Sequence, residues 1–299
     1  MPRSERETQD RIIDMFTNSQ NPSFLGYQNK GSLSGRNQNR NIEKEWLEEN
    51  LIQRGYSNAQ ISAAILELET ATETTRTTLY QANLRTYQLL RYGIPVQVDL
   101  GRSHETVHLI DWDHPAENHF ALSEEVTLRG GSERRPDIIL YINGIAVVVI
   151  ELKKSSIEVG DGIRQLITNQ EEMFNSWFFS TVQIVLAGND SQGLRYGTIG
   201  TPEQFFVQWK DDGTNGDFQD PLSEGSILDR PIAQLCNKTR LLDLIYNFMI
   251  FDAGQKKLPR PHQFQAVKAT QARIGKKEGG VIWHTQGSGK SILMVLIAK

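Results

Sequence analysis

The chain has 299 residues, of which 38% are hydrophobic and 23% charged, with a formal net charge of −4 at pH 7. This composition is normal for a globular protein of about two domains, and its slight acidity excludes a generally basic nucleic-acid-binding protein. No apolar run approaches the ~20 residues of a membrane helix, the N-terminus lacks a signal-peptide core, and the single cysteine, Cys236, excludes an internal disulfide. We therefore expect a cytoplasmic protein with no membrane segment.

The N-terminal third of the chain is predicted to be helical apart from one irregular arm. Ser4 and Glu7 have the spacing of a capping box, which predicts a helix over 4–16. Residues 17–41 are rich in Asn, Gln, Ser and Gly and are interpreted as the arm. Apolar residues at helical spacing predict three further helices, over 42–53, 57–71 and 77–91.

The pattern changes to short β-like segments at Pro95. Strands are predicted within 95–100, 106–112, 119–128 and 134–154, followed by a helix over 162–178 and a strand over 181–187. Residues 211–226 are interpreted as a loop, and 232–251 as a helix. This order predicts an α/β fold with a mixed central sheet flanked by helices.

The segment RRPDIILYINGIAVVVIELKK, residues 134–154, combines two apolar strands with charged ends. Strand alternation puts Glu151 and Lys153 on one face, and Asp137 begins the neighbouring strand. Two carboxylates can hold Mg²⁺, the metal can activate a water, and the lysine can position that water or neutralise charge on phosphorus. These parts suit phosphodiester hydrolysis. The simpler alternative is a solvated strand end with a turn residue after Pro136.

The turn between these strands constrains that interpretation. A two-residue Asn143-Gly144 turn pairs residues 142 and 145 and leaves Asp137 on the face away from Glu151. A three-residue loop with Gly144 in a left-handed bulge position brings Asp137 to the face of Glu151. We therefore predict a bulged hairpin or an equivalent irregularity, and a strict two-residue turn would count against the site.

Basic residues gather around this segment, although the chain is acidic overall. The candidates for contacting DNA phosphates are Arg134, Arg135, Lys154 and Arg164. A merely solvated strand end remains the alternative for this cluster.

A second candidate site is HTQGSGKS, residues 284–291, preceded by the predicted strand VIW and followed by an apolar helix. Gly287 and Gly289 let backbone N–H groups turn toward phosphate oxygens, Lys290 can reach the terminal phosphates, and Ser291 can bind Mg²⁺. His284 stands where the strict phosphate-loop pattern has glycine. The complete set of candidate ATP-binding residues is Gln263, Thr285, Gly287, Ser288, Gly289, Lys290 and Ser291.

Together these motifs carry a family resemblance. RPD followed by ELK resembles the PD-(D/E)xK nuclease signature, and NIEKEWLEENLIQRGYS, GIRQLITNQ and WHTQGSGKS extend the likeness to the R (motor and nuclease) subunit of type I restriction enzymes over residues 41–291. RPHQFQAV resembles the adenine-contacting motif of superfamily 2 helicases, with Gln263 as the contact.

The resemblance implies a role for individual residues. It implies metal binding by Asp137 and Glu151, catalysis by Lys153, and assistance to the metal by Glu43 in the family's first helix. It also implies an auxiliary catalytic role for Gln165 of a Gln-x-x-x-Tyr motif. Asn169 occupies the tyrosine position here, which puts that auxiliary role in doubt.

The resemblance also implies a domain order, cofactors and partners. Residues 1–41 are expected to form the N-terminal helix and arm, 42–250 the PD-(D/E)xK endonuclease domain, and 251–299 the truncated start of a RecA-like, ATP-dependent helicase or translocase domain. The implied cofactors are Mg²⁺ and ATP. The implied partners are double-stranded DNA and the modification (M) and specificity (S) subunits.

Two other functions stay open at this stage. One is a nucleotide-binding DNA motor whose nuclease-like part is an inert docking module. The other is a repair or recombination nuclease fused to a helicase.

Overall fold

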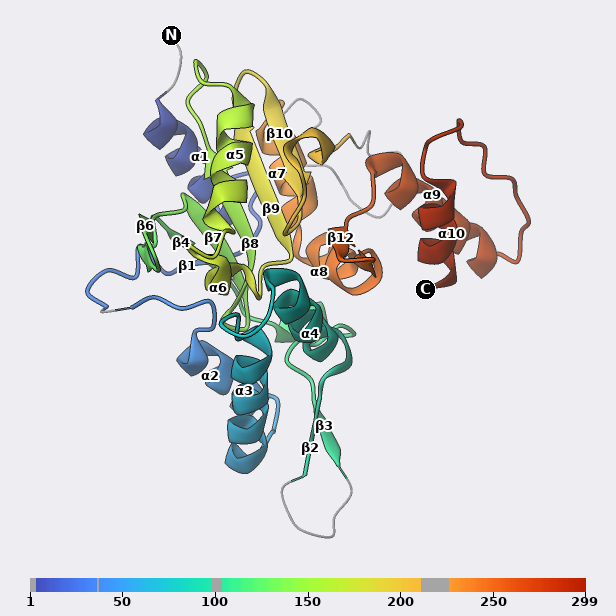
Figure 1. Cartoon of the computed structure of the whole chain (residues 1–299). Helices are drawn as coiled ribbons and strands as arrows, with labels where there is room; N and C mark the ends of the chain where they lie inside the picture. Colours follow the sequence, from blue (N-terminus) through green and yellow to red (C-terminus); the bar gives the residue numbers. More distant parts are fainter. Residues whose placement is uncertain (1–3, 37, 98–103, 211–225) are drawn as a thin grey trace.

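The structure of the protein is a computed structural model, which describes residues 4–36, 38–97, 104–210 and 226–299. A mixed six-stranded sheet lies at the centre (Figure 1), and its order in space is β1 (Gln28–Asn29), β4 (Phe120–Glu124), β7 (Ile138–Ile142), β8 (Ile145–Leu152), β9 (Ile184–Asn189) and β10 (Gly193–Gly197). β1 pairs with β4, and β8 with β9, in parallel, whereas the other neighbours are antiparallel. The α/β class with a mixed sheet is thus confirmed.

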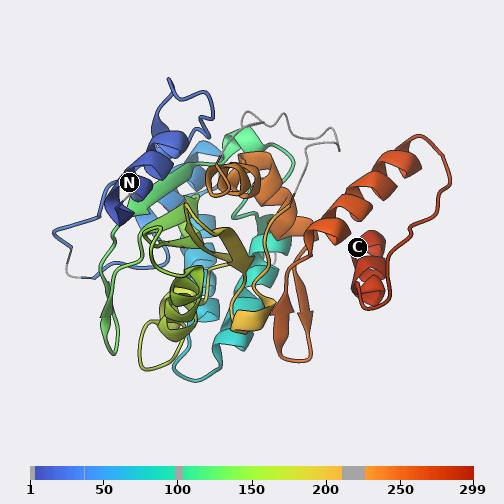
Figure 2. The same cartoon turned by 90° about the horizontal axis from the view of Figure 1, so that it is seen from above.

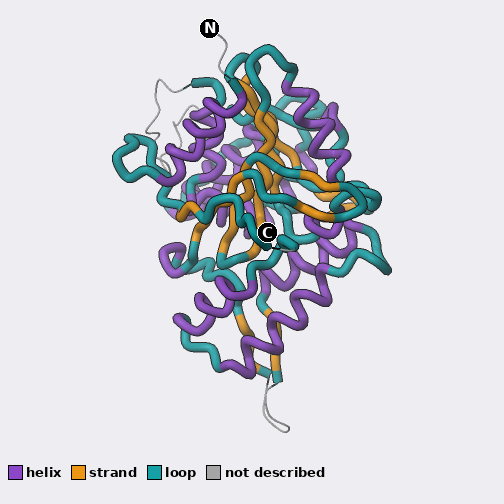
Figure 3. Tube along the Cα trace, turned by 90° about the vertical axis from the view of Figure 1, so that its left-hand side faces the viewer, coloured by secondary structure: helices purple, strands orange, loops and turns teal. Residues whose placement is uncertain are grey.

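Helices cover both faces of this sheet, and Figure 3 shows strands running between helices. The helices are α1 (Glu5–Thr17), α2 (Lys44–Gln53), α3 (Asn58–Thr72), α4 (Leu79–Tyr92), α5 (Val159–Asn169), α6 (Ser176–Phe179), α7 (Asp229–Cys236), α8 (Lys238–Asn247), α9 (Pro261–Gly275) and α10 (Lys290–Ala298). The four predicted N-terminal helices are confirmed, and α1 and α3 begin at the expected capping boxes of Ser4 and Ser57.

Three sequence predictions differ from the structure. The helix predicted over 162–178 is divided into α5 and α6, and the helix over 232–251 is divided at Asn237. Asn237 has an extended ψ of 131°, and its side chain caps α8 by accepting a hydrogen bond from the Arg240 N–H. The strand predicted over 281–283 is not formed. These residues pair with no strand among the described residues, and Trp283 is 89% exposed.

The alternation of β7 and β8 supplies two hydrophobic cores, one on each face of the sheet. On one face, Ile138 and Ile150 pack in a cluster that includes Ile12 and Phe16 of α1. On the other, Ile139, Tyr141 and Val149 pack in a cluster with Leu166 of α5 and Phe178 of α6. Figure 1 shows α5 on the near face and α7 behind the sheet. α5 is the crossover between the parallel strands β8 and β9.

The N-terminal arm is joined to this architecture rather than separate from it. β1 lies within the predicted irregular arm and adds a strand beside Ala121 and Leu122 of β4. Tyr27 is buried, and its hydroxyl donates to the Cys236 carbonyl at 2.7 Å. A two-residue strand carries little sequence signal, so β1 could not be predicted within an arm of this composition.

Three two-stranded ribbons complete the described structure. They are β2 (Ile94–Val96) with β3 (Glu105–Val107), β5 (Leu128–Arg129) with β6 (Glu133–Arg134), and β11 (Ile250–Asp252) with β12 (Gln255–Lys257). The predicted loop over 211–226 falls almost wholly outside the described residues.

A buried lysine attaches the β11–β12 ribbon to the sheet domain. Lys256 Nζ donates to Asn83 Oδ1 at 2.8 Å and to Gln183 Oε1 at 2.6 Å. Burial lowers the pKa of Lys256 well below its ordinary value. Beyond this ribbon, α9 and α10 lie to one side of the sheet, as the view from above shows (Figure 2). No helix among the described residues is long and apolar enough to cross a membrane.

Candidate active site and phosphate loop

The hairpin of β7 and β8 closes with a two-residue turn. Ile142 pairs with Ile145, and Asn143 and Gly144 both have positive φ, of 50° and 81°. This is the backbone of a tight hairpin turn, which Asn-Gly favours. The three-residue loop considered from the sequence is therefore wrong, and the two-residue turn taken alone counts against the site.

The expected irregularity lies instead within the strands. Tyr141 pairs with Ala146, but Leu140 pairs with Val148, so Val147 is an additional residue in β8. This β-bulge shifts the register by one residue, and each such shift exchanges the two faces of a strand. The alternative form of the prediction, an equivalent irregularity, is thus confirmed.

The bulge brings the two predicted carboxylates together. Ile138 pairs with Ile150, so the register continues with Asp137 directly opposite Glu151. Asp137 Oδ2 accepts a hydrogen bond from the Leu152 N–H at 2.6 Å. Lys153 Nζ donates to Glu151 Oε1 at 2.7 Å. The structure thus gathers Asp137, Glu151 and Lys153 at one end of the central hairpin.

Burial makes this pair electrostatically costly. Glu151 is 1% exposed, and burial followed by the charge of Asp137 raises its pKa to about 8. Burial also raises the pKa of Asp137 to about 6, against the opposing effects of the Leu152 N–H and the Lys153 charge. For Lys153, burial lowers the pKa, but the hydrogen bond to Glu151 and the charges of ionised Glu151 and Asp137 outweigh burial and raise it.

The donor set fits a hard divalent cation. Glu151 Oε2 is buried and has no hydrogen-bond partner among the described residues. Two facing carboxylates that repel each other, one with an unpaired oxygen, are stabilised by a cation between them. The described residues contain no group of three acidic, His or Cys side chains close enough to hold a metal. The candidate site therefore offers two protein ligands, which suits Mg²⁺ because that ion usually retains several waters.

The acidic residue expected to assist this pair lies elsewhere. The Glu43 N–H donates to the Gly144 carbonyl at 2.7 Å, and its carboxylate pairs with Arg36. Glu43 is therefore anchored at the turn end of the hairpin, six residues of β8 or about 20 Å from Glu151. The geometry does not support the metal-binding role predicted for Glu43.

Glu5 of α1 is the acidic residue that the structure brings near the pair. Its negative charge contributes to raising the pKa of both Asp137 and Glu151. Gln9, one turn further along α1, donates from Nε2 to the Asp137 carbonyl at 3.2 Å. Sequence reasoning missed Glu5 because more than a hundred residues separate it from the hairpin and its only local signal was a position in the first turn of a helix.

Helix α5 crosses the same face as the carboxylate pair. A Cβ on Gly162 would lie 3.5 Å from Lys153 Cγ and 3.7 Å from Glu151 Cγ. Gln165 follows three residues later on the same helix face and is half-buried. Asn169, at the tyrosine position of the family motif, is one further turn along and accepts a hydrogen bond from Arg134 Nε at 3.0 Å.

The candidate DNA-binding cations differ in their surroundings. Arg164 pairs with Asp161 and Glu203, and Arg135 lies 3.6 Å from Glu125. Lys154 is exposed at the end of β8. Arg134 is half-buried between Asn169 and a phenyl ring.

The glycine-rich segment 284–291 has the backbone expected of a phosphate loop. Gly287 and Gly289 have φ values of 79° and 80°, and α10 begins directly after Gly289. Lys290 Nζ donates to the carbonyls of Thr285 at 3.0 Å and His284 at 3.2 Å. The Lys290 side chain therefore lies across its own loop, at the N-terminus of α10. A helix N-terminus favours phosphate oxygens. Ser291, in the first turn of α10, is exposed, and the buried Ser288 Oγ has no partner among the described residues.

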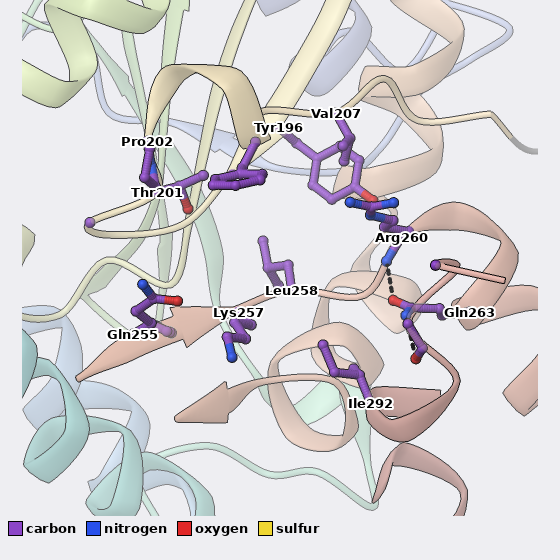
Figure 4. Close-up of a pocket in the computed structure, with 16 residues that line it drawn as sticks. Tyr196, Thr201, Pro202, Val207, Gln255, Lys257, Leu258, Arg260, Gln263 and Ile292 are labelled. Carbon is purple, nitrogen blue, oxygen red and sulfur yellow. Dashed lines mark hydrogen bonds between the residues drawn. The ribbon is translucent and has the colours of Figure 1, made fainter. Parts of the chain in front are cut away.

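Gln263 connects this loop to α9. Its Oε1 accepts from the Arg260 N–H at 2.8 Å, and its Nε2 donates to the carbonyls of Ser288 at 3.2 Å and Gly289 at 3.1 Å. Figure 4 shows Gln263 at the edge of a cavity of about 290 Å³. Residues of the sheet domain, including Tyr196 and Phe205, line the cavity together with this loop.

The fold and the site define a restriction-endonuclease-like α/β domain, with a carboxylate pair and a lysine on the central hairpin, followed by a glycine-rich segment at 284–291. Residues 2–204 match the family model of the type I restriction enzyme R protein N terminus, and residues 262–299 match that of the SWI2/SNF2 ATPase. The chain therefore belongs to the family of the type I restriction enzyme R protein N terminus. Residues 205–261 lie between the two matches, so the domain boundary expected at 250–251 stays a prediction.

Curated relatives agree with this family. The chain is 31% identical over 261 residues, 79% of its length and 24% of the relative, to the type I restriction enzyme HindI endonuclease subunit of Haemophilus influenzae. It is 29% identical over 232 residues, 70% of its length and 21% of the relative, to a putative type I restriction enzyme MjaVIIIP endonuclease subunit of Methanocaldococcus jannaschii. The chain thus spans a quarter or less of the length of these relatives.

Proposed function

We propose that this chain carries the Mg²⁺-dependent nuclease of a type I restriction R subunit and hydrolyses phosphodiester bonds of double-stranded DNA. The observation that carries the proposal is the register of the central hairpin, in which Asp137 lies opposite Glu151 with Lys153 bonded to that glutamate. The relatives named above are endonuclease subunits, which supports the same reaction class.

Each residue of the site has a distinct part in the proposed reaction. Asp137 and Glu151 would hold Mg²⁺, with Glu5 adding negative charge nearby. The bound ion would supply a water of lowered pKa and neutralise charge on the phosphate. Lys153 fixes the Glu151 carboxylate through one N–H and has two further N–H groups to donate to a phosphate oxygen or the attacking water. Gln165 would orient a phosphate oxygen through its amide.

We further propose that the phosphate loop binds ATP as part of a DNA translocase. The positive φ values of Gly287 and Gly289 and the position of Lys290 at the start of α10 support a phosphate site. The match of 262–299 to an ATPase family supports the motor assignment. Modification and specificity subunits are the proposed partners, and they would supply recognition of the DNA sequence. The cytoplasm is the proposed compartment.

The test uses the full-length subunit in its restriction complex, with Asp137→Ala, Glu151→Ala and Lys153→Ala. Each variant should lose DNA cleavage by at least about a hundredfold while ATP hydrolysis stays near the wild-type rate. Glu172→Ala, which removes an exposed carboxylate after α5, is the matched control and should cleave normally.

Two outcomes would contradict the proposal. Cleavage that survives all three substitutions would remove the site from the reaction. Loss of complex assembly, without any effect of Mg²⁺ on the hairpin, would instead favour the inert docking module.

A further inference from the structure

The β5–β6 ribbon is fastened to the segment that follows α5. The Gly131 N–H donates to the Phe174 carbonyl at 3.1 Å, and Asn175 Nδ2 donates to the Ser132 carbonyl at 3.3 Å. A Cβ on Gly131 would lie only 2.1 Å from the Met173 carbonyl oxygen, so the contact requires glycine. The ribbon therefore has a defined position relative to α5.

This ribbon presents Arg134 in a fixed orientation. Arg134 Nε donates to Asn169 Oδ1 at 3.0 Å, and Nη1 donates to the Glu133 carbonyl at 3.2 Å. The guanidinium carbon lies 4.3 Å from the centroid of the Phe174 ring. A planar guanidinium held by stacking and a hydrogen bond loses little further entropy when it binds an oxygen ligand.

Both partners in this contact retain unused donors. Arginine has five N–H donors, and two of those of Arg134 have acceptors among the described residues. Asn169 is 1% exposed, and its Nδ2 is buried with no acceptor among the described residues. A buried donor without an acceptor is costly, so Asn169 is poised to serve a further oxygen ligand if one approaches Arg134.

The separation between the carboxylate pair and Asn169, the partner of Arg134, is comparable with the spacing of phosphates along a DNA strand. Gly162 of α5 lies against Glu151, and Asn169 is seven residues further along the same helix. Seven residues of α-helix span about 10 Å. One strand of B-form DNA carries a phosphate for about every 3.4 Å of axial rise, so this separation covers at most about three nucleotides.

Arg134 is also the candidate arginine whose described partners carry no negative charge. Asp161 and Glu203 pair with Arg164, and Glu125 pairs with Arg135, whereas the described partners of Arg134 are neutral oxygens and a ring. Neutral partners orient a cation without reducing its attraction for phosphate.

We propose that Arg134, oriented by Asn169 and Phe174, binds a backbone phosphate of the DNA within about three nucleotides of the bond that is cut. The inference rests on the proposed nuclease function for the position of that bond. Asn169 is a positioning residue, which takes the place of the tyrosine of the family motif and acts through Arg134. The ligand is the sugar-phosphate backbone, so the contact carries no sequence preference.

The test is DNA binding by the 299-residue chain in EDTA, measured by fluorescence anisotropy of a labelled duplex from about 50 to 200 mM KCl. Arg134→Gln should weaken binding roughly tenfold and reduce the slope of log K against log salt by about 0.9, the value for one phosphate contact. Arg85→Gln, which removes an exposed cation from α4, is the matched control and should leave the slope unchanged.

A second variant separates binding from folding of the ribbon. Asn169→Asp keeps the acceptor for Arg134 Nε but adds a charge that competes with phosphate, so it should also reduce the slope. Asn169→Ala should weaken DNA binding when it is the only substitution. It should have little further effect when it is combined with Arg134→Gln. A structural role alone would alter thermal stability and leave the salt slope intact.

The results that would contradict this inference differ from those that would contradict the nuclease proposal. An unchanged slope in folded Arg134→Gln or Asn169→Asp protein, or an absence of salt-dependent binding by the wild-type chain, would overturn the inference. Because EDTA prevents metal binding, these results do not depend on cleavage. Cleavage that survives Asp137→Ala would overturn the nuclease proposal whatever the slope.

Discussion

Replacing Glu151 with glutamine should change how the stability of the protein depends on pH. Burial raises the pKa of Glu151 to about 8 from an ordinary value of 4.5. When a carboxyl group has a higher pKa in the folded state, the folded state must keep a proton that the unfolded state releases. The free energy of unfolding therefore falls as the pH rises between these two values.

The magnitude follows from that shift. One pKa unit corresponds to about 1.4 kcal/mol, so between about pH 5 and pH 7.5 the Glu151 carboxyl should lower the free energy of unfolding by about 3 kcal/mol. Glutamine does not titrate, and its amide oxygen can still accept the Lys153 hydrogen bond. As the pH rises over this range, the free energy of unfolding of the wild-type protein should thus fall by about 3 kcal/mol relative to that of Glu151→Gln.

The assay is urea unfolding followed by tryptophan fluorescence in EDTA, with Glu172→Gln as the control for loss of one exposed carboxylate. Adding Mg²⁺ at about a hundred times its dissociation constant should raise the free energy of unfolding of the wild-type protein at pH 7.5 by about 2.7 kcal/mol. The same addition should leave the free energy of unfolding of Glu151→Gln almost unchanged. A wild-type-minus-variant difference that stays constant within about 0.5 kcal/mol from pH 5 to pH 7.5 would refute the electrostatic account of the pair.

Three further predictions concern other parts of the molecule. Gly131→Ala should lower thermal stability and weaken DNA binding, because its Cβ would meet the Met173 carbonyl at 2.1 Å; unaltered melting and binding would refute the ribbon contact. Lys256→Met should remove a gain in unfolding free energy that the wild-type protein shows as the pH rises toward 10.5, the ordinary pKa of lysine, because burial lowers the folded pKa of this lysine; parallel pH profiles in urea would contradict that. Lys290→Ala should abolish ATP hydrolysis by the full-length subunit, and a retained rate would argue against the phosphate loop.

The sequence predicted the parts of the fold that depend on local pattern. The capping boxes at Ser4 and Ser57 located two helix starts, and the apolar run before Glu151 located the central strand. Local patterns succeed here because a capping hydrogen bond spans three residues and a strand face repeats every second residue.

The register of the hairpin was predicted only in part. The need to bring Asp137 and Glu151 to one face indicated an irregularity, but its place could not be deduced, because three identical residues, Val147 to Val149, follow one another in the run. The bulge depends on how two consecutive valines pack against the core below the sheet, which is a tertiary effect.

The surroundings of the site were the least predictable part. Glu43 matched the family's first helix in sequence, yet a backbone hydrogen bond to Gly144 fixes it at the wrong end of the hairpin. Glu5 and the contact of Arg134 with Asn169 depend on elements brought together over long separations in the chain. Pattern within a single sequence holds no record of such contacts.

The central claim is that Asp137 and Glu151 together hold the metal ion of a nuclease. The most direct measurement is a crystal of the chain soaked in Mn²⁺, as a replacement for Mg²⁺, with the ion located by anomalous scattering. The account predicts one ion bound to an oxygen of each carboxylate at about 2.1–2.2 Å and absent from Glu151→Gln crystals. An ion bound elsewhere, or an empty site between two ionised carboxylates at saturating Mn²⁺, would contradict it.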